Sequence, residues 1–299
     1  MAKKKTRPPK KHHYSSQFYL GGFVDPTNPP EIWVYRKEDG RVFSSGSEAF
    51  GFENHYNTFI NAKGERDSSS IERMLCKIEG MAGDAIRTIR SRQLPSPEER
   101  LMFCAFVGIM ILRTPRYRKE FQEETAEFLR MIGKDSVQDL DKLRRDVARY
   151  EKETLQELGS SVEELQRCVL EDELTWVVSG SESLRMFGVF DELADILYRM
   201  RWTYVERPPE TGFISSDSPV VQIPEPPEYG LMDQRIQITF PLSSDLACIG
   251  TWGNPREECF GRATEEIAGI INRRTAKSAT REVYASENSD AILRLLQAQ

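Results

Sequence analysis

One apolar segment, Leu101–Leu112, limits what this chain can fold into more than any other part of the sequence. Ser96-Pro97-Glu98-Glu99 comes just before it, and a proline at the first helical position removes an N–H that has no helical partner. The segment falls well short of the roughly 20 residues that a membrane-spanning helix needs. It therefore predicts a helix over residues 97–113 that is buried in the core of a globular fold.

Further helix signals run from about residue 68 to residue 201. Ser69-x-x-Glu72 and Ser161-x-x-Glu164 match the capping box, in which the serine and glutamate side chains satisfy each other's free backbone N–H groups. Between Val137 and Tyr150 apolar residues recur every three or four positions, which is typical of an amphipathic helix. Helices are predicted over residues 69–92, 97–113, 115–132, 136–158, 161–172 and 181–201.

Strand signals lie on both sides of this helical stretch. Ile32–Tyr35 and Val42-Phe43 flank an Asp39-Gly40 pair, and Asp-Gly between two apolar, β-prone runs is a strong hairpin signal. Short apolar or alternating runs return towards the C-terminus, where helix signals accompany them. The later strands are expected at 213–214, 220–221, 236–240, 246–249 and 282–285, with helices near 263–276 and 290–297.

The order of these signals predicts an α+β fold that is predominantly helical. Because strands lie near both ends of the chain, we expect N- and C-terminal strands to join one small antiparallel or mixed sheet that packs against the central helices. The predicted organisation is a basic disordered tail over residues 1–11 and a single domain over 12–299. Within the domain we expect an N-terminal β element (12–67), a helical region (68–205), and C-terminal strands and helices (206–299).

Charge is distributed unevenly along the chain. The formal net charge is −6, while the first 11 residues carry six basic side chains and no acid, so the remainder carries −12. An acidic body of this kind is a poor surface for nucleic acid, because neutralising phosphates requires clustered cations. We expect the basic tail to be a solvated, solubilising terminus, with nonspecific contact with a nucleic acid as the alternative.

The cysteines and the start of the chain point to a reducing compartment. The 5 cysteines are odd in number, scattered, and include no C-x-x-C pair, which argues against a disulfide framework and against a thiolate zinc site. The basic N-terminus has no apolar run behind it, so we expect no secretory signal. We therefore expect a cytoplasmic protein with no membrane partner.

Motifs spread along the chain resemble a bacterial family catalogued as domain of unknown function 4238. The motifs that carry the resemblance are His12-His13-Tyr14, Gln17–Leu20 with Phe23, Trp33-Val34-Tyr35, Ile71-Glu72, Glu79, Arg113-Thr114-Pro115, Phe213–Val220 and Phe240–Ser243. The sequence departs from the family pattern at Ser15-Ser16, where a small hydrophobic residue and a proline are expected. The motifs occur in order over most of the chain, so the resemblance is global. It implies no established activity.

Two adjacent histidines, His12 and His13, are the first candidates for chemistry, since histidine is the side chain that titrates nearest to neutral pH. Adjacent side chains point to opposite faces of a strand, so the two are poorly placed to bind one metal ion together. If a helix begins here, His13 and Gln17 share one of its faces. The alternative is that these histidines are buried hydrogen-bonding anchors of the N-terminal β element.

Three acidic residues are candidates for metal binding or acid–base catalysis. Asp217 follows a strand within Ser-Asp-Ser-Pro, a common place for a metal ligand or general base, although the same sequence is also typical of a turn. Glu72 and Glu79 are seven residues apart and lie roughly on one helix face. They could hold a divalent cation, or Glu72 could serve only in its capping box.

Arg113 is the candidate for anion recognition. It ends the apolar helix, where a cation complements the helix dipole, and its planar guanidinium binds phosphate or carboxylate through two parallel hydrogen bonds. The alternative is an internal salt bridge, for which Asp217 and Glu72 are the expected partners.

Several well-known catalytic motifs are missing: the P-loop, G-x-G-x-x-G, H-E-x-x-H and G-x-S-x-G. The leading hypothesis is a metal-dependent phosphodiesterase or nuclease, with a cytoplasmic toxin or defence effector as its biological role. Catalysis is assigned to residues that come from distant parts of the chain to one sheet edge, namely His12, His13, Gln17, Arg113 and Asp217. Glu72 and Asp217 are the expected ligands of the metal, Mg²⁺ or Mn²⁺.

The rival hypothesis is a non-enzymatic binding or regulatory module. In that case the same histidine, arginine and aspartate side chains form an internal polar network, which locks the β element onto the helices and requires no substrate.

Overall fold

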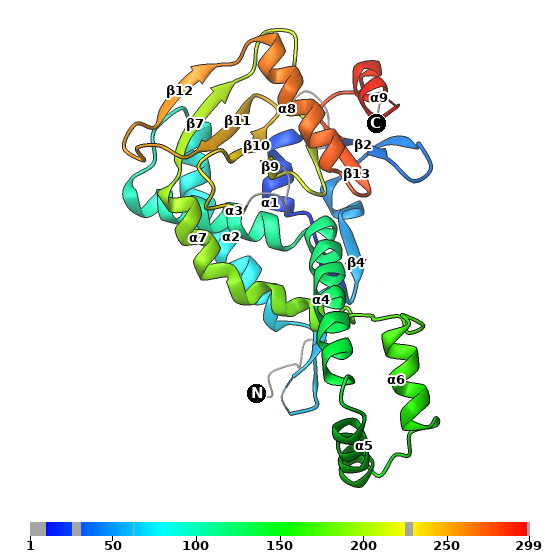
Figure 1. Cartoon of the computed structure of the whole chain (residues 1–299). Coiled ribbons are helices and arrows are strands. Elements are labelled where there is room, and N and C mark those ends of the chain that lie inside the picture. Colours follow the sequence, from blue (N-terminus) through cyan, green and yellow to red (C-terminus); the bar gives the residue numbers. More distant parts are fainter. Residues whose placement is uncertain (1–9, 26–30, 62, 225–229, 298–299) are drawn as a thin grey trace, which may run out of the picture. The chain divides into compact units, whose positions relative to one another are not determined.

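The computed structural model describes residues 10–25, 31–61, 63–224 and 230–297 (Figure 1). The chain forms two compact units, one made of residues 1–118 and 184–299 and the other of residues 119–183. The helical region expected over residues 68–205 is thus divided between them. Most of the basic tail expected over residues 1–11 lies outside the described residues, and Lys11 already belongs to the first strand.

The larger unit contains a five-stranded sheet in the order β12-β7-β11-β10-β9. All neighbours in it are antiparallel except β12, which runs parallel to β7. Its strands are β7 (Arg201–Glu206), β9 (Val221–Ile223), β10 (Gln237–Ser243), β11 (Leu246–Thr251) and β12 (Cys259–Arg262). β7 and β12 are absent from the predicted strands, and β7 is the strand that joins β11 to β12 in this sheet.

The apolar segment forms α3 (Pro97–Leu112), which covers one face of this sheet. Phe103 of α3 packs against Trp202 of β7 with ring centroids 5.1 Å apart, and Phe106 lies 6.3 Å from Phe240 of β10. These aromatic side chains are fully buried. The prediction of a buried core helix is confirmed.

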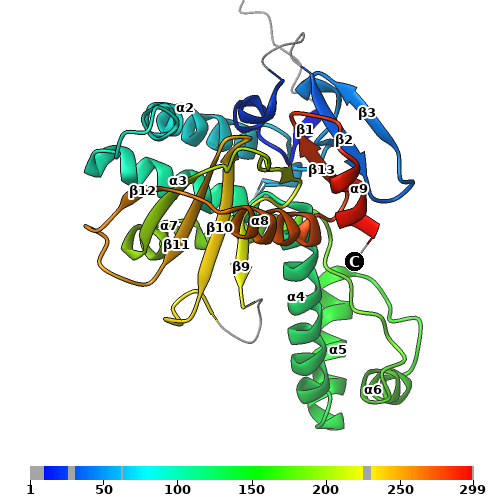
Figure 2. The same cartoon turned by 90° about the horizontal axis from the view of Figure 1, so that it is seen from above.

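Helices cover both faces of the five-stranded sheet. α2 (Ser70–Arg90) and α7 (Phe190–Arg199) pack against α3. On the other face, Val205 of β7 packs with Ala268 and Ile271 of α8 (Glu265–Ser278). Trp202 and Val205 thus point to opposite faces, as the alternation of side chains along a strand requires. Figure 2 shows α3 and α8 on either side of the strands.

A second, four-stranded sheet joins the two ends of the chain in the order β3-β2-β13-β8. Its strands are β2 (Ile32–Arg36), β3 (Val42–Ser45), β8 (Ser215–Ser216) and β13 (Glu282–Ala285). The predicted β2–β3 hairpin is present, and Gly40 in its turn has a φ of 69°, which favours glycine. The α+β class and the pairing of N- and C-terminal strands are confirmed, but the strands expected in one sheet are divided between two.

Shorter elements complete the larger unit. Two-stranded sheets pair β1 with β4 and β5 with β6. Their bounds, with those of the remaining short elements, are β1 (Lys11–His13), α1 (Gln17–Leu20), η1 (Gly21–Phe23), η2 (Ser47–Ala49), β4 (Phe52–Asn54), β5 (Phe59–Ile60), β6 (Arg66–Asp67), η3 (Glu182–Val189) and α9 (Asp290–Gln297). The helix expected over residues 181–201 is a 3₁₀ helix, η3, followed by α7.

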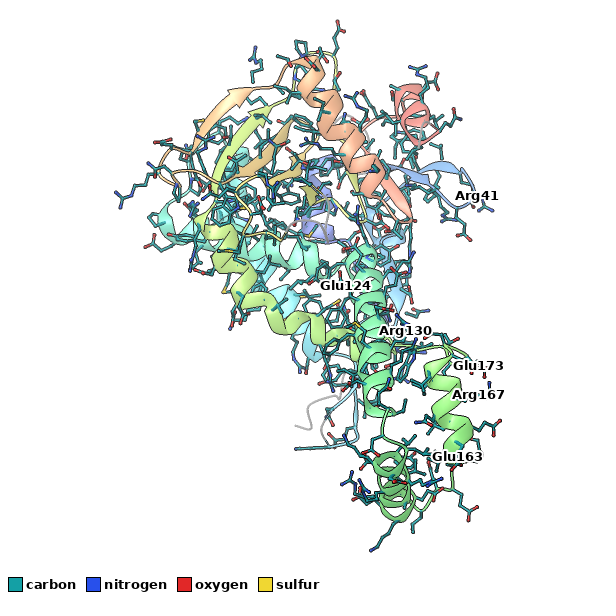
Figure 3. The ribbon with its side chains drawn as sticks, in the orientation of Figure 1. Arg41, Glu124, Arg130, Glu163, Arg167 and Glu173 are labelled. Atoms are coloured by element: carbon teal, nitrogen blue, oxygen red, sulfur yellow. The ribbon has the colours of Figure 1, made fainter. Side chains whose placement is uncertain are left out.

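The smaller unit is helical. α4 (Pro115–Ser136) begins in the larger unit, and the smaller unit starts within this helix, at Lys119. α5 (Leu140–Thr154) and α6 (Val162–Leu170) follow. Its core is a small cluster of three buried side chains, Val137, Leu143 and Val169. Ion pairs lie on its surface. One of them joins Arg167 to Glu173 at 2.6 Å, and Figure 3 labels both residues. No helix among the described residues of the whole chain is both long and apolar enough to cross a membrane.

The start of α2 differs from the predicted capping box. Ser69 occupies the N-cap, but its side chain makes no capping hydrogen bond. The carboxylate of Asp67 accepts hydrogen bonds from the backbone N–H groups of Ser69 and Ser70 instead, both at 2.9 Å. The reciprocal capping box predicted for Ser69 and Glu72 is therefore absent. By contrast, Ser161 accepts a hydrogen bond from the N–H of Glu164, so that cap is present.

We expect Asp67→Ala to lower the free energy of unfolding by about 1 kcal/mol, the usual cost of removing an N-terminal helix cap. Ser69→Ala is the matched control and should cost clearly less, because that hydroxyl caps no backbone N–H. Urea denaturation of both variants measures the difference. Equal losses in the two variants would contradict the assignment of the cap to Asp67.

Candidate functional site

The two histidines lie on β1 and point to opposite sides, as the sequence predicts. His12 is fully buried, and its Nδ1 accepts a hydrogen bond from the backbone N–H of Asn57 at 2.8 Å. This hydrogen bond fixes the orientation of the buried ring. His12 therefore serves as an anchor between β1 and the segment after β4, which is the structural alternative stated for it.

His13 is partly exposed and more available for chemistry. Its Nε2 lies 2.9 Å from the side-chain amide nitrogen of Gln17, and its ring meets Phe52 edge-on at 5.6 Å. The contact with Gln17 is the expected one, although the two residues belong to β1 and α1 rather than to one helix. Burial, followed by the positive charge of Arg113, lowers the pKa of His13, so the imidazole is neutral at pH 7.

Arg113 caps the C-terminus of α3 and is 3% exposed. Its guanidinium donates one hydrogen bond to the carboxylate of Glu79 on α2 and another, at 2.6 Å, to the backbone carbonyl of His13. The salt bridge anticipated for Arg113 is thus present, but its partner is Glu79 rather than Asp217 or Glu72. One side chain fastens α3, α2 and β1 together.

Beside this contact lies a second polar group, formed by Glu72, Asn57 and Arg118. The side-chain amide of Asn57 donates to Glu72 Oε1 at 2.7 Å, and Arg118 donates to Asn57 Oδ1 at 3.1 Å. Glu72 Oε1 also lies 4.0 Å from His12 Nδ1. The guanidinium of Arg118 stacks over the ring of Tyr56, 3.4 Å from its centroid. Glu72 therefore belongs to the network around the histidines.

Asp217 follows β8 and is fully buried. Its carboxylate accepts hydrogen bonds from the backbone N–H groups of Thr280 at 2.9 Å and Arg281 at 2.8 Å. Burial nevertheless raises the pKa of Asp217 to about 6, and the nearby charge of Glu282 adds to this. Asp217 thus holds the turn between α8 and β13, and its hydrogen bonds connect it to none of the other candidate residues.

The expected metal site has no complete ligand set in the part of the chain that the structure describes. No group of three or more histidine, cysteine, aspartate or glutamate side chains is arranged there to hold a metal ion. Glu72 Oε1 is bonded to Asn57, and both carboxylate oxygens of Asp217 are bonded to backbone N–H groups. Glu72 and Asp217 accordingly have separate structural partners.

Several residues of the network were not anticipated. Asn57 lies in a loop, and Arg118 lies on α4 within a sequence rich in charged residues. No local sequence pattern predicts that either residue belongs to this network. Cys76 lies one turn from Glu72 on the same face of α2, and burial together with the carboxylates of Glu79 and Glu72 raises the pKa of its thiol. A raised pKa opposes thiolate formation, so Cys76 gains no support as a nucleophile.

The serines that depart from the family pattern have structural partners. Ser15 Oγ lies 3.2 Å from the hydroxyl of Tyr284 on β13, and Ser16 caps α1 by accepting a hydrogen bond from the N–H of Tyr19. Both serines are buried. They stabilise the short connection between β1 and α1, and so help to place His13 beside Gln17.

Comparison with known proteins gives one family. A family model described as "Protein of unknown function (DUF4238)" matches residues 11–289, nearly the whole chain. The match confirms the resemblance found from the sequence motifs. No curated protein and no solved structure matches the chain.

We expect Asp217→Ala to lower the free energy of unfolding by about 2–4 kcal/mol, because it leaves two backbone N–H groups without an acceptor. Asp217→Asn, which keeps one acceptor oxygen, should cost less. Urea denaturation at pH 7 measures both losses. An unchanged free energy of unfolding in Asp217→Ala would contradict the structural role of this carboxylate.

The same carboxyl group predicts a pH dependence. Because the pKa of Asp217 rises from 3.8 to about 6 on folding, the folded protein binds this proton more tightly than the unfolded chain does. Its contribution to stability is therefore fully present below pH 4 and is lost as the pH rises through 6. The difference in unfolding free energy between wild type and Asp217→Asn, followed from pH 4 to pH 7, should show this slope; a flat difference would contradict it.

Proposed function

We propose that the chain, which belongs to the DUF4238 family of proteins of unknown function, is a phosphodiester-cleaving enzyme with His13 as its acid–base group. One observation carries the proposal: the charges that act on the His13 imidazole include those of Arg113, Glu72 and Glu79, which come from two other elements. An imidazole that is neutral at pH 7 and surrounded by fixed charges is suited to general-base catalysis.

In this proposal His13 removes the proton from the attacking hydroxyl or water. Gln17 orients the imidazole through its contact with Nε2, and its amide must leave Nε2 before that nitrogen accepts the proton. Arg113 is too deeply buried to bind a substrate directly, so it serves as a fixed positive charge that favours the negative charge developing on the phosphate. Glu79 holds Arg113 in place. His12 and Asp217 are left out of the chemistry, because their hydrogen bonds to the backbone account for their burial.

A divalent cation, Mg²⁺ or Mn²⁺, stays part of the proposal, with Glu72 as its ligand from this network. Glu72 Oε1 is bonded to Asn57, which leaves Oε2 for a ligand. Carboxylate oxygens are the ligands that both ions prefer. Asp217 is left out of this ligand set, because both of its carboxylate oxygens accept hydrogen bonds from backbone N–H groups.

A nucleic acid is the proposed substrate. Lys11 immediately precedes the histidines, with its ammonium 4.2 Å from the centroid of the Phe52 ring, the same ring that His13 contacts. The basic tail, residues 1–11, is the segment proposed to contact the phosphates. The proposed setting is the bacterial cytoplasm, with a role as a toxin or defence effector.

The second candidate function is a non-enzymatic binding or regulatory module. It is favoured by the internal hydrogen bonds that Arg113 and Asp217 make without a substrate. On this alternative the network only fixes the N-terminal β element to the helices.

Cleavage of labelled RNA and DNA by the purified protein tests the proposal, with Mg²⁺, Mn²⁺ or a chelator present. We expect His13→Ala to lower kcat/KM by about 10²–10⁴-fold, the usual contribution of an acid–base group. His55→Asn is the matched control: His55 is exposed and has a φ of 62°, which asparagine tolerates, so activity should be retained.

The pH profile supplies an independent readout. Because the pKa of His13 is lowered, kcat/KM should rise with pH along a limb centred below 6.5 and stay high at pH 7. Absence of cleavage under every metal condition, or cleavage that survives in His13→Ala, would overturn the proposal. The first result would favour the binding module.

A further inference from the structure

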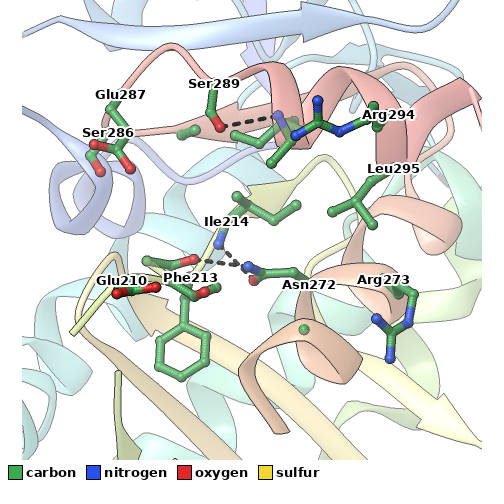
Figure 4. A pocket seen from close by; sticks show the side chains of 16 residues that line it. Glu210, Phe213, Ile214, Asn272, Arg273, Ser286, Glu287, Ser289, Arg294 and Leu295 are labelled. Atoms are coloured by element: carbon green, nitrogen blue, oxygen red, sulfur yellow. Dashed lines mark hydrogen bonds between the residues drawn. The ribbon is translucent and has the colours of Figure 1, made fainter. Parts of the chain in front are cut away.

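A pocket of about 360 Å³ opens on the larger unit between α8 and α9 (Figure 4). It is lined by the connection before β8, by α8, by the end of β13 and by α9. None of the residues assigned to the proposed phosphodiesterase chemistry lines it. Pockets of this size hold small organic ligands.

The floor of the pocket is apolar and rigidly held. Phe213, Ile214 and Ile292 contribute buried side chains to the lining. The side-chain amide of Asn272 on α8 fixes this floor, accepting a hydrogen bond from the N–H of Ile214 at 3.1 Å and donating one to the carbonyl of Gly212 at 2.8 Å. Since Asn272 is 5% exposed and both of its amide atoms are used, the floor is preformed rather than shaped by a ligand.

The walls carry opposite charges on opposite sides. Figure 4 shows Arg273 and Arg294 on one side of the pocket and Glu210 and Glu287 on the other. All four residues are exposed. Among the described residues, none of the four charged groups has an ion-pair or hydrogen-bond partner, whereas most of the other arginines of the larger unit are paired.

Four unpaired charges around an apolar floor define a ligand by complementarity. The two guanidinium groups favour a carboxylate, which they can bind through paired hydrogen bonds. The two carboxylates favour an ammonium group. Phe213 and Ile214 are already buried, so an apolar body packed against this floor would gain free energy chiefly by removing its own apolar surface from water.

We propose that this pocket binds a small zwitterion with an apolar body, of the chemical class of a short hydrophobic peptide with both ends free. The ligand's carboxylate lies at Arg273 and Arg294, its ammonium at Glu210 and Glu287, and its side chains on the floor between them. The proposal is independent of the phosphodiesterase proposal, since it uses none of the same residues.

Leucyl-leucine is the probe that tests this inference, followed by ligand-detected NMR titration with the full chain. We expect saturable binding with a Kd on the order of 1 mM or tighter, in keeping with a ligand of this size. The C-terminal amide of leucyl-leucine, which lacks the carboxylate, should bind at least ten-fold more weakly. N-acetyl-leucyl-leucine, which lacks the ammonium, should be weakened as well.

Two double variants assign the charges to their sides. Arg273→Gln with Arg294→Gln should weaken leucyl-leucine at least ten-fold while leaving the melting temperature unchanged, because neither arginine has a partner to lose. Glu210→Gln with Glu287→Gln should weaken leucyl-leucine but not its N-acetyl form. Arg145→Gln, an exposed arginine on α5 outside the pocket, is the matched control and should bind as wild type does.

The inference fails if leucyl-leucine shows no saturable binding, or if it binds equally well to the arginine double variant. It also fails if the dipeptide and its amide bind with equal affinity, because the carboxylate would then make no contact with the guanidinium groups.

Discussion

The position of β1 in the larger unit depends on the hydrogen bonds of the buried Arg113 guanidinium. α3 ends there, and the same side chain reaches Glu79 on α2 and the carbonyl of His13 on β1. A strand of three residues has little apolar surface with which to hold its position. Arg113 provides that fixation through charge-assisted hydrogen bonds, which are stronger than those between neutral groups. His13 owes its location to a neighbour 100 residues further along the chain.

Much of the fold follows from local sequence. The Asp39-Gly40 turn predicts its hairpin, and Ser96-Pro97 predicts the start of α3 within a residue, because both signals act through the backbone of the residues themselves. The predicted cap of α2 is wrong, since a serine and a glutamate at the right spacing cannot reveal that Asp67, two residues before Ser69, accepts hydrogen bonds from the first N–H groups of the helix. β7 is absent from the predicted strands although its run of β-prone residues, Trp202–Val205, signals a strand, whereas β12 depends on its pairing with the distant β7.

The candidate site was predictable in its residue types and less so in its partners. Four of the residues named from the sequence lie in or beside one network, namely His13, Gln17, Glu72 and Arg113. Asp217 carries a carboxylate in a plausible turn, but only the fold shows that its acceptors are used by the turn after α8. Asn57 and Arg118 contribute through long-range hydrogen bonds that no local pattern encodes. Sequence identifies groups that can do chemistry; tertiary contacts decide which are free to do it.

Native-state hydrogen exchange in Arg113→Met tests most directly whether this guanidinium holds β1 in place. The backbone amides to follow are those paired between β1 and β4, together with the N–H of Tyr14, which donates to the carbonyl of Gly51 at 2.9 Å. Protection of these amides should fall at least ten-fold, about 1.4 kcal/mol, relative to the amides between β10 and β11. A uniform loss across both sets, or unchanged protection of β1, would contradict the account.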